Sequence, residues 1–315
     1  MTTLRRVAAF LMVVNVLSAA GAAQQPPAKP PAGKPQADQE EPKPQAPPLF
    51  PRHRRGLYRN TEGVEVIDAT PQSPPLDTDD PGVPDKGVFE LNFTTHADYA
   101  KAAQRIDLLW VDANYGVLPV IAGHRVPTQI KLEFPLAAAR QAGEDFQAGL
   151  GAATFGVKFN FYDDEHRGIS VAVYPQLEFV APGSHAVRKG LAEKGQTVIL
   201  PLLVARQFHQ FTLVFNGSLE KPVHDPERPT TSQFGIGVGR ALTRKLAAMI
   251  ELRTESSLDF KSDRLVDVNA GVLHGVRNVI LYANLGRSLF ADTHTAHTYA
   301  GFGLKALIDT KKKKP

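Results

Sequence analysis

The feature that most constrains this chain is a one-by-one alternation of apolar and polar residues, which begins at Gly87 and continues almost to the end. Residues 89–94 read FELNFT, residues 129–134 read QIKLEF and residues 300–306 read AGFGLKA. Successive side chains of a β-strand point to opposite faces, so this pattern predicts strands with one apolar and one polar face. No stretch of this region has the periodicity of a convincing amphipathic helix.

About twelve such segments follow one another, each near the ~10 residues that a tilted membrane strand requires. The sixth is unusual because Val198 to Val204 is apolar on both faces. The predicted strands span residues 87–97, 105–115, 127–137, 148–161, 168–180, 196–206, 209–219, 231–242, 245–255, 264–274, 278–288 and 297–308.

The lengths of the connections carry a second signal. If the N-terminus lies in the periplasm, most even-numbered connections are short (162–167, 207–208, 243–244 and 275–277), and 116–126 is the exception. Several odd-numbered connections are long, at 181–195, 220–230, 256–263 and 289–296. Short periplasmic turns and longer external loops are typical of outer-membrane barrels, whereas a soluble β-sandwich has no reason to keep this parity.

The N-terminal part of the chain has a different composition. Arg5 and Arg6 precede a short apolar core and a run of small residues, which predicts a signal peptide over residues 1–23. The alternative is a transmembrane anchor, but the apolar core falls short of the ~20 residues that a span needs. Residues 24–86 are rich in Pro, Gln, Lys and Glu, which predicts a disordered linker, with a short strand or plug element around residues 63–69.

An acidic run lies near the end of this predicted linker. Asp77, Asp79, Asp80 and Gly82 partly match a calcium-binding loop, but Pro81 occupies a ligand position and the bidentate Glu is missing. We therefore expect a solvated acidic turn.

Composition excludes several classes of protein. The 315 residues contain no Cys, which rules out disulfides, thiolate metal sites and a Cys nucleophile. Part of the net charge of +4 comes from the basic tail, residues 309–315. The body has no clustered basic face with aromatic platforms, so nucleic acid is not expected as a partner.

Together these features predict an all-β fold: a transmembrane antiparallel up-and-down β-barrel of about twelve strands over residues 87–308, preceded by the disordered Pro-rich segment. A water-soluble barrel or sandwich remains the alternative, because the alternation looks the same when the apolar face points inward. The membrane interpretation predicts location in the cell outer membrane of a Gram-negative-type envelope. Its partners would be outer-membrane lipid and the barrel-assembly machinery.

One segment carries a family resemblance. Residues 149–161 (GLGAATFGVKFNF) resemble a recurrent strand of outer-membrane proteins named for the meta-pathway of phenol degradation. Hairpins at residues 235–252 and 267–289 are similar in style to those of the same family. Ala152 stands where the family commonly has Asp, and a basic tail follows the last predicted strand. The resemblance implies a barrel that transports small solutes, hydrophobic or aromatic ones among them.

A search for catalytic groups gives little. HExxH, the P-loop and the G-x-S-x-G elbow are absent from the sequence. His294 and His297 lie in a predicted external loop with Asp292 as their one near carboxylate, so we expect polar loop residues and not a metal site. Ser170 and His209 are the only pair that we can nominate for a hydrolase. We therefore predict no enzyme activity, no cofactor and no metal.

Two further patterns concern the inside and the ends of the predicted barrel. Gly235, Gly237 and Gly239 recur at period 2, which allows close approach or a packed interior on that face. Aromatic residues near the strand ends are expected to form interface girdles: Tyr99, Trp110, Tyr115, Phe146, Phe208, Phe234, Phe260, Phe290 and Tyr299.

The polar faces of the predicted strands would line the lumen. Both signs of charge are present, so the interior is either a network of ion pairs that closes the barrel or a wetted path for small solutes. The leading hypothesis is an outer-membrane channel or transporter. The alternatives are a non-conducting structural barrel that displays loops or a periplasmic tether, and an outer-membrane hydrolase. The predicted lumen-lining residues are Glu90, Asn92, Lys131, Glu133, Lys158, Asn160, Gln176, Glu178, Asn216, Glu251, Arg253, Asp267, Asn269, Tyr282, Asn284 and Lys305.

Overall fold

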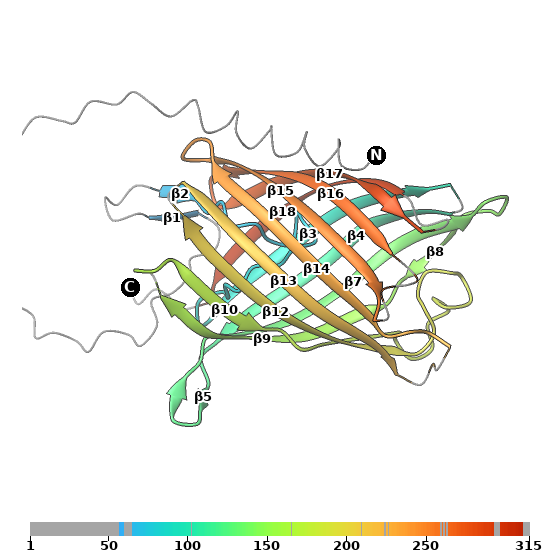
Figure 1. Ribbon diagram of the computed structural model, residues 1–315, viewed down its shortest axis with the longest axis horizontal. Coiled ribbons are helices and arrows are strands. Elements are labelled where there is room, and N and C mark those ends of the chain that lie inside the picture. The colour runs from blue at the N-terminus through green and yellow to red at the C-terminus, as the bar shows by residue number, and fades with distance from the viewer. Residues whose placement is uncertain are drawn as a thin grey trace, which may run out of the picture. The chain divides into compact units, whose positions relative to one another are not determined.

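The computed structural model describes residues 57–59, 65–101, 103–164, 166–208, 210–223, 225, 227–258, 260, 262, 264–292 and 297–310. These residues contain no helix, and most of them form one closed antiparallel barrel of twelve strands (Figure 1). The last strand pairs with the first strand of the wall, which closes the barrel and confirms the predicted fold class.

The strands of the wall match the predicted segments in number and order. Their bounds are β3 (Val88–Ala100), β4 (Ala103–Val117), β7 (Thr128–Gln141), β8 (Gln147–Leu150), β9 (Ala153–Asp164), β10 (Ile169–Val173), β11 (Gln176–Phe179), β12 (Gln196–Phe208), β13 (Phe211–Val223), β14 (Thr231–Ala241), β15 (Leu246–Ser257), β16 (Leu265–Val276), β17 (Val279–Ala291) and β18 (His297–Asp309).

Two of the predicted strands are interrupted. Strands β8 and β9 both pair with β7, and strands β10 and β11 both lie between β9 and β12, so each pair forms one strand of the wall. The second break falls at Tyr174 and Pro175. Proline has no backbone N–H to donate, so a break in the hydrogen-bond ladder is expected there.

Two small hairpins lie outside the wall. Strand β5 (Val120–Ile121) pairs with β6 (His124–Arg125) inside the second connection, which explains why this even-numbered connection is long. Its two turn residues, Ala122 and Gly123, both have positive φ, as a tight two-residue hairpin requires. The other hairpin joins β1 (Leu57–Arg59) to β2 (Glu65–Ile67), and β2 falls where a short strand was predicted.

The two faces of the wall are inverted relative to a water-soluble barrel. On β7, Ile130, Leu132 and Phe134 are 40%, 45% and 38% exposed on the outer face, whereas Lys131 between them is 8% exposed. The same holds on β18, where Phe302 is 64% exposed and Lys305 is 1% exposed. Water-soluble monomers do not carry a continuous apolar belt of this kind, so the outer face has the character of a lipid-facing surface.

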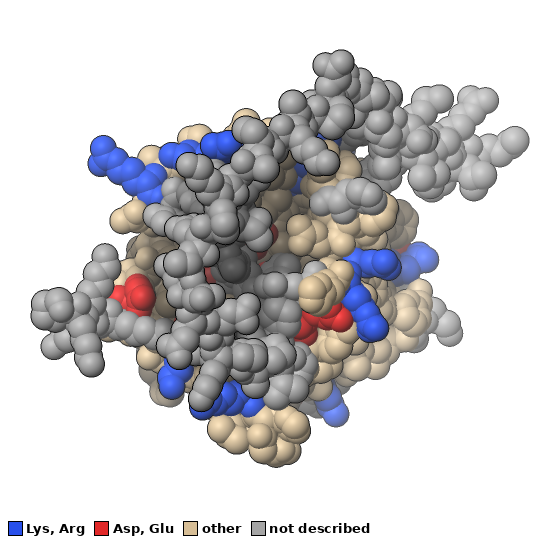
Figure 2. Space-filling view, turned by 90° about the vertical axis from the view of Figure 1, so that its left-hand side faces the viewer, with Lys and Arg blue, Asp and Glu red and all other residues tan. Residues whose placement is uncertain are grey.

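The connections keep the predicted parity. The even-numbered turns 165–168, 209–210, 242–245 and 277–278 are short, whereas the odd-numbered connections include the long segment 180–195. We call the end that carries the even-numbered turns the inner end, and the opposite end the outer end. Exposed Lys and Arg side chains surround the rim of the inner end (Figure 2); they include Arg125, Arg167, Arg206, Arg244, Lys245 and Arg277.

Among the described residues there is no helix with the length and apolarity needed to cross a membrane.

The plugged lumen as candidate functional site

We call residues 65–87 the plug, because the part of this segment from Ile67 to Pro84 lies inside the barrel. It enters at the inner end, where the Ile67 N–H donates to the Arg244 carbonyl at 2.8 Å. It returns to the same end, where the Gly87 carbonyl accepts the Thr310 N–H at 3.0 Å. The prediction of a disordered linker therefore does not hold for residues 65–86, while residues 24–56 and 60–64 lie outside the described residues.

A track of glycines on the inner face lets the plug lie against the wall. A Cβ at Gly239 would overlap the Ala69 carbonyl, and one at Gly237 would come within 2.7 Å of Pro71. On β16, a Cβ at Gly271 would lie 2.9 Å from Pro75. The period-2 glycines predicted to permit close approach therefore face the plug, which occupies the space that side chains would fill.

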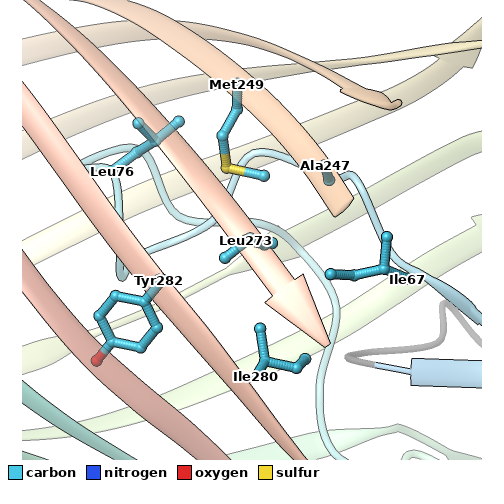
Figure 3. Packing of buried hydrophobic residues seen from close by; sticks show 7 residues of the cluster. All are labelled: Ile67, Leu76, Ala247, Met249, Leu273, Ile280 and Tyr282. Carbon is cyan, nitrogen blue, oxygen red and sulfur yellow. The ribbon is translucent and has the colours of Figure 1, made fainter. Parts of the chain in front are cut away.

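The plug also has an apolar contact with the wall (Figure 3). Ile67 and Leu76, each 2% exposed, contact a cluster on the inner face of three neighbouring strands, as the close-up shows. Burying apolar surface contributes about 25 cal/mol per Å², so this cluster favours the inserted position. The wall residues of the cluster are Ala247, Met249, Leu273, Ile280 and Tyr282.

The turn of the plug, which lies furthest from the inner end, is held by a carboxylate on β15. Glu251 is 2% exposed and accepts the backbone N–H of Asp77 at 2.9 Å and of Thr78 at 2.7 Å. The Asn269 side-chain amide donates to the same carboxylate at 3.0 Å. The Tyr299 hydroxyl donates to Asp77 at 3.5 Å. One buried charge thus satisfies two backbone donors at the turn of the plug.

The prediction of a solvated acidic turn is wrong for Asp79 and Asp80, which are 15% and 1% exposed, whereas the Asp77 side chain is 45% exposed. Lys158 on β9 is fully buried, and its ammonium group donates to the Asp79 carboxylate at 2.9 Å and to the Asp80 carbonyl at 2.7 Å. Asn160 is the next inward-facing residue of β9, and its side-chain amide donates to the Pro81 carbonyl at 3.0 Å. A lysine on the wall provides the counter-charge that makes burial of the turn possible.

A second buried lysine holds the entering part of the plug. Lys305 on β18 is 1% exposed, donates to the Gln72 amide oxygen and lies 3.3 Å from the Glu90 carboxylate. Burying such a pair costs much of the attraction it provides, but removing one partner leaves an uncompensated charge. These contacts therefore fix where the plug lies and add little to the free energy of unfolding of the protein.

The wall beside the plug carries its own polar network. The Asp112 carboxylate accepts the side-chain amides of Asn92 at 2.9 Å and Asn114 at 3.0 Å. Lys131 pairs with Glu133 at 2.7 Å and lies 4.0 Å from Asp112. The network ties β3, β4 and β7 together across the inside of the barrel.

The structure places the predicted lumen-lining residues on the inner face of the wall. They form two groups, those that contact the plug and those that do not. Lys158, Asn160, Glu251 and Lys305 bind the plug directly. Arg253 lies 3.9 Å from Asp77 of the plug, and Tyr282 belongs to the apolar cluster that packs against Ile67 and Leu76. The sequence analysis missed Asp112, Asn114 and Gln129, which the same alternation on β4 and β7 indicates, and the plug residues Gln72, Asp77, Asp79 and Asp80.

Two other predicted positions change. His297 begins β18 and points inward, 3.2 Å from Asp267 and 3.4 Å from Asp98, so it does not lie in an external loop. Tyr299 is 4% exposed and interior, so it belongs to no interface girdle. In the interior, the Ser170 hydroxyl accepts a hydrogen bond from the Asn160 side-chain amide.

His209 of the candidate hydrolase pair and His294 of the predicted external loop lie outside the described residues. In the described part of the chain, no group of three His, Asp or Glu residues has metal-binding geometry.

The long connection at residues 180–195 folds onto the outer end of the lumen. Ala186 and Leu191, each 1% exposed, pack against Ala137 on the inner face of β7. Arg105 donates to the Leu191 carbonyl at 3.1 Å, and Lys189 donates to the Ala148 carbonyl at 2.6 Å. The connection therefore narrows the outer opening instead of extending into solvent.

A cavity of about 160 Å³ lies between the turn of the plug and the wall strands β11 to β15. Two neighbouring wall strands line it with different side chains, β12 with apolar ones and β13 with polar ones. The lining residues are Asp77, Thr78, Asp79, Tyr174, Gln176, Ile199, Pro201, Leu203, Asn216, Ser218, Glu220, Gln233, Phe234, Gly235 and Arg253.

Comparison with known proteins supports the fold. No known family and no curated protein matches the sequence. Among solved structures, an outer membrane channel from Pseudomonas putida F1 is similar at a TM-score of 0.58 and 10% identity, covering 72% of this chain and 97% of that chain. The NanC porin (TM-score 0.46, 6% identity, 69% and 98% covered) and the KdgM porin (TM-score 0.44, 7% identity, 68% and 98% covered) are less similar. At these identities, the first similarity shows that this chain has the fold of an outer-membrane β-barrel.

Proposed function

We propose that this protein is an outer-membrane channel for small solutes and that the plug is its gate. The observation that carries the proposal is a closed, polar-lined barrel whose lumen is filled by a separate segment of the same chain. No strand of the wall contributes to the plug, so the plug can leave without breaking the barrel.

The membrane location rests on the inverted faces. The apolar side chains on the outer face would meet lipid, and the charged residues of the inner face would meet water or the plug. Cell fractionation followed by gel migration with and without boiling tests this location. Recovery in the outer membrane with a boiling-dependent shift supports it, whereas soluble periplasmic protein without a shift contradicts it.

The gate rests on the type of contact that holds the plug. Hydrogen bonds and ion pairs join the plug to the wall, as at Glu251, Lys158 and Lys305. Water can replace such contacts when the plug moves, so breaking each hydrogen bond to a charged group costs a net ~1.5–3 kcal/mol. The small apolar cluster at Ile67 and Leu76 also resists release.

A disulfide can lock the gate, because the natural chain contains no Cys. A Cβ at Gly235 would lie 3.9 Å from the Thr78 Cβ, within the ~3.5–4.5 Å range of disulfides. We expect Thr78→Cys with Gly235→Cys to abolish ion conductance in planar bilayers when oxidised and to regain it on reduction. The two single Cys variants are the matched controls and should be insensitive to redox state.

The same experiment separates the channel from a structural barrel. A variant lacking residues 65–86 that still shows the boiling-dependent gel shift should conduct constantly. If neither this variant nor the reduced double variant conducts, the protein is a non-conducting barrel that displays its loops, and the proposal fails. Equal conductance in the oxidised and reduced states would show that the plug is not the gate.

The solute class is the finer part of the proposal. The resemblance to the phenol meta-pathway proteins supports small solutes, hydrophobic or aromatic ones among them. Liposome swelling with solutes of similar size and different polarity tests this class. Of the candidate hydrolase pair, Ser170 lies within the polar network and accepts a hydrogen bond from Asn160, and His209 lies outside the described residues.

A further inference from the structure

The cavity beside the turn of the plug has an apolar side that a polar lumen does not require. Three successive inward-facing residues of β12 line the cavity: Ile199, Pro201 and Leu203. These residues are why the sequence at 198–204 is apolar on both faces. An apolar stripe that meets water on the inside of a barrel is unfavourable, so an apolar group is expected to cover it.

The next strand of the wall, β13, presents hydrogen-bond acceptors to the cavity directly beside this apolar stripe. Along the inner face of β13, Asn216 and Ser218 each have a buried side-chain oxygen with no hydrogen-bond partner among the described residues. Glu220 follows on the same face and accepts a hydrogen bond from Gln233 at 2.6 Å. Buried acceptors without a partner are costly and rare in native proteins, so these atoms point to a bound donor.

The charges around the cavity leave it net negative. Arg253 is 2.9 Å from Glu255 and 3.9 Å from Asp77, so one guanidinium faces two carboxylates. Asp79 is paired with Lys158, and Glu220 has no ion pair within 4 Å among the described residues. A cation is therefore favoured at this site, and an anion is disfavoured.

From these three observations we infer that the cavity binds a small amine with an apolar body. The ammonium group donates to Glu220 and to the Ser218 hydroxyl, and the apolar body covers the neighbouring Ile199, Pro201 and Leu203. The volume of about 160 Å³ is close to the ~150 Å³ of an engineered cavity that binds benzene, so a one-ring amine fits. The inference rests on the proposed channel function, for which this site is the selective position next to the gate.

Calorimetric titration of the full chain in an uncharged detergent tests the inference. The probes are benzylamine, benzyl alcohol and benzoate, which share one ring and differ in the charge of the head group. We expect saturable one-to-one binding of benzylamine, binding of benzyl alcohol weaker by about tenfold or more, and no binding of benzoate. Equal binding of all three would overturn the inference, and so would no binding of any, which would leave the cavity to water.

Variants identify the site. Glu220→Gln keeps the shape and removes the charge, and should weaken benzylamine binding by about tenfold without changing that of benzyl alcohol. Ile199→Ser should weaken both probes. Glu144→Gln on the exposed 142–146 connection is the matched control and should change neither.

The test is independent of folding defects and of conductance. Each variant is first checked for the boiling-dependent gel shift, and Ser218→Ala provides a second, smaller change at the same site. Unchanged benzylamine binding in both Glu220→Gln and Ser218→Ala would contradict the site. Calorimetry needs no open channel, so a failed conductance assay would leave this result intact, and the reverse also holds.

Discussion

The carboxylate of Glu251 on β15 accepts the backbone N–H of Thr78 at 2.7 Å, and this contact joins the turn of the plug to the wall of the barrel. The same carboxylate accepts the N–H of Asp77, so two backbone donors depend on one side chain. Both donors lie deep in the lumen, where an unsatisfied N–H is costly.

Replacing Glu251 should therefore loosen the plug. Hydrogen bonds to a charged group contribute about 1.5–3 kcal/mol each, and Glu251→Ala removes two of them. We expect more frequent openings in planar bilayers, with Glu251→Gln intermediate because its amide oxygen still accepts. Glu144→Gln on an exposed connection should behave as the natural protein. Unchanged opening in Glu251→Ala would show that this contact does not hold the gate.

A methyl group on the glycine track should displace the plug. Gly239→Ala places a Cβ onto the Ala69 carbonyl, and neither group is at the flexible end of a side chain. We expect constant conductance with an unchanged boiling-dependent gel shift, because the barrel wall itself has room. Gly217→Ala on β13 is the control, since its Cβ would lie 3.6 Å or more from neighbouring atoms. Equal behaviour of the two variants would contradict the close approach.

The outer face can be tested with a charge. Leu132→Arg on β7 should destabilise the barrel by ~2–4 kcal/mol if the residue lies near the bilayer midplane. Ile121→Arg in the β5–β6 hairpin is matched, because Ile121 is 43% exposed and Leu132 is 45% exposed. Urea unfolding in lipid vesicles measures both variants. If both are tolerated equally, water surrounds the wall and the membrane interpretation is wrong.

An ion pair at the outer end should make the contact between the connection before β16 and the connection after β17 weaker in acid. Arg264 donates to Asp292 at 2.7 and 3.0 Å, and these hydrogen bonds hold the pKa of the Asp292 carboxyl below its usual range. The stabilising contribution is therefore present above the pKa of the unfolded state and is lost as the pH falls through the lower folded-state value. We expect only a local effect, because both side chains are at the surface.

Hydrogen exchange of the Asp292 amide, which donates to the Arg264 carbonyl at 3.0 Å, measures this effect. At neutral pH the amide should be more protected in the natural protein than in Asp292→Asn, and the difference should vanish in acid. Asp145→Asn on the exposed 142–146 connection should leave protection unchanged. Equal protection at neutral pH in the natural protein and in Asp292→Asn would show that the pair contributes nothing.

The sequence predicted the wall of the barrel well, for a local reason. Whether a side chain faces in or out depends on the parity of its position in the strand, and parity is visible in segments such as QIKLEF at residues 129–134. The lengths of the connections then predicted which end of the barrel carries the short turns and which carries the longer loops. The interruption at Pro175 was also visible as a residue type, although the predicted span 168–180 ran through it.

The plug was decided by tertiary structure. Residues 65–86 have few large apolar side chains and many prolines, so by themselves they predict an extended chain in water. Their burial depends on partners far along the sequence: Lys158 for Asp79, Glu251 for Thr78, and the glycines of β14 for Ala69 and Pro71. The alternation along each strand determined which residues of the wall face inward, but only closure of the barrel brought those residues around the plug. The charge and space that the plug requires come from several strands at once, and no local pattern in the sequence records that arrangement.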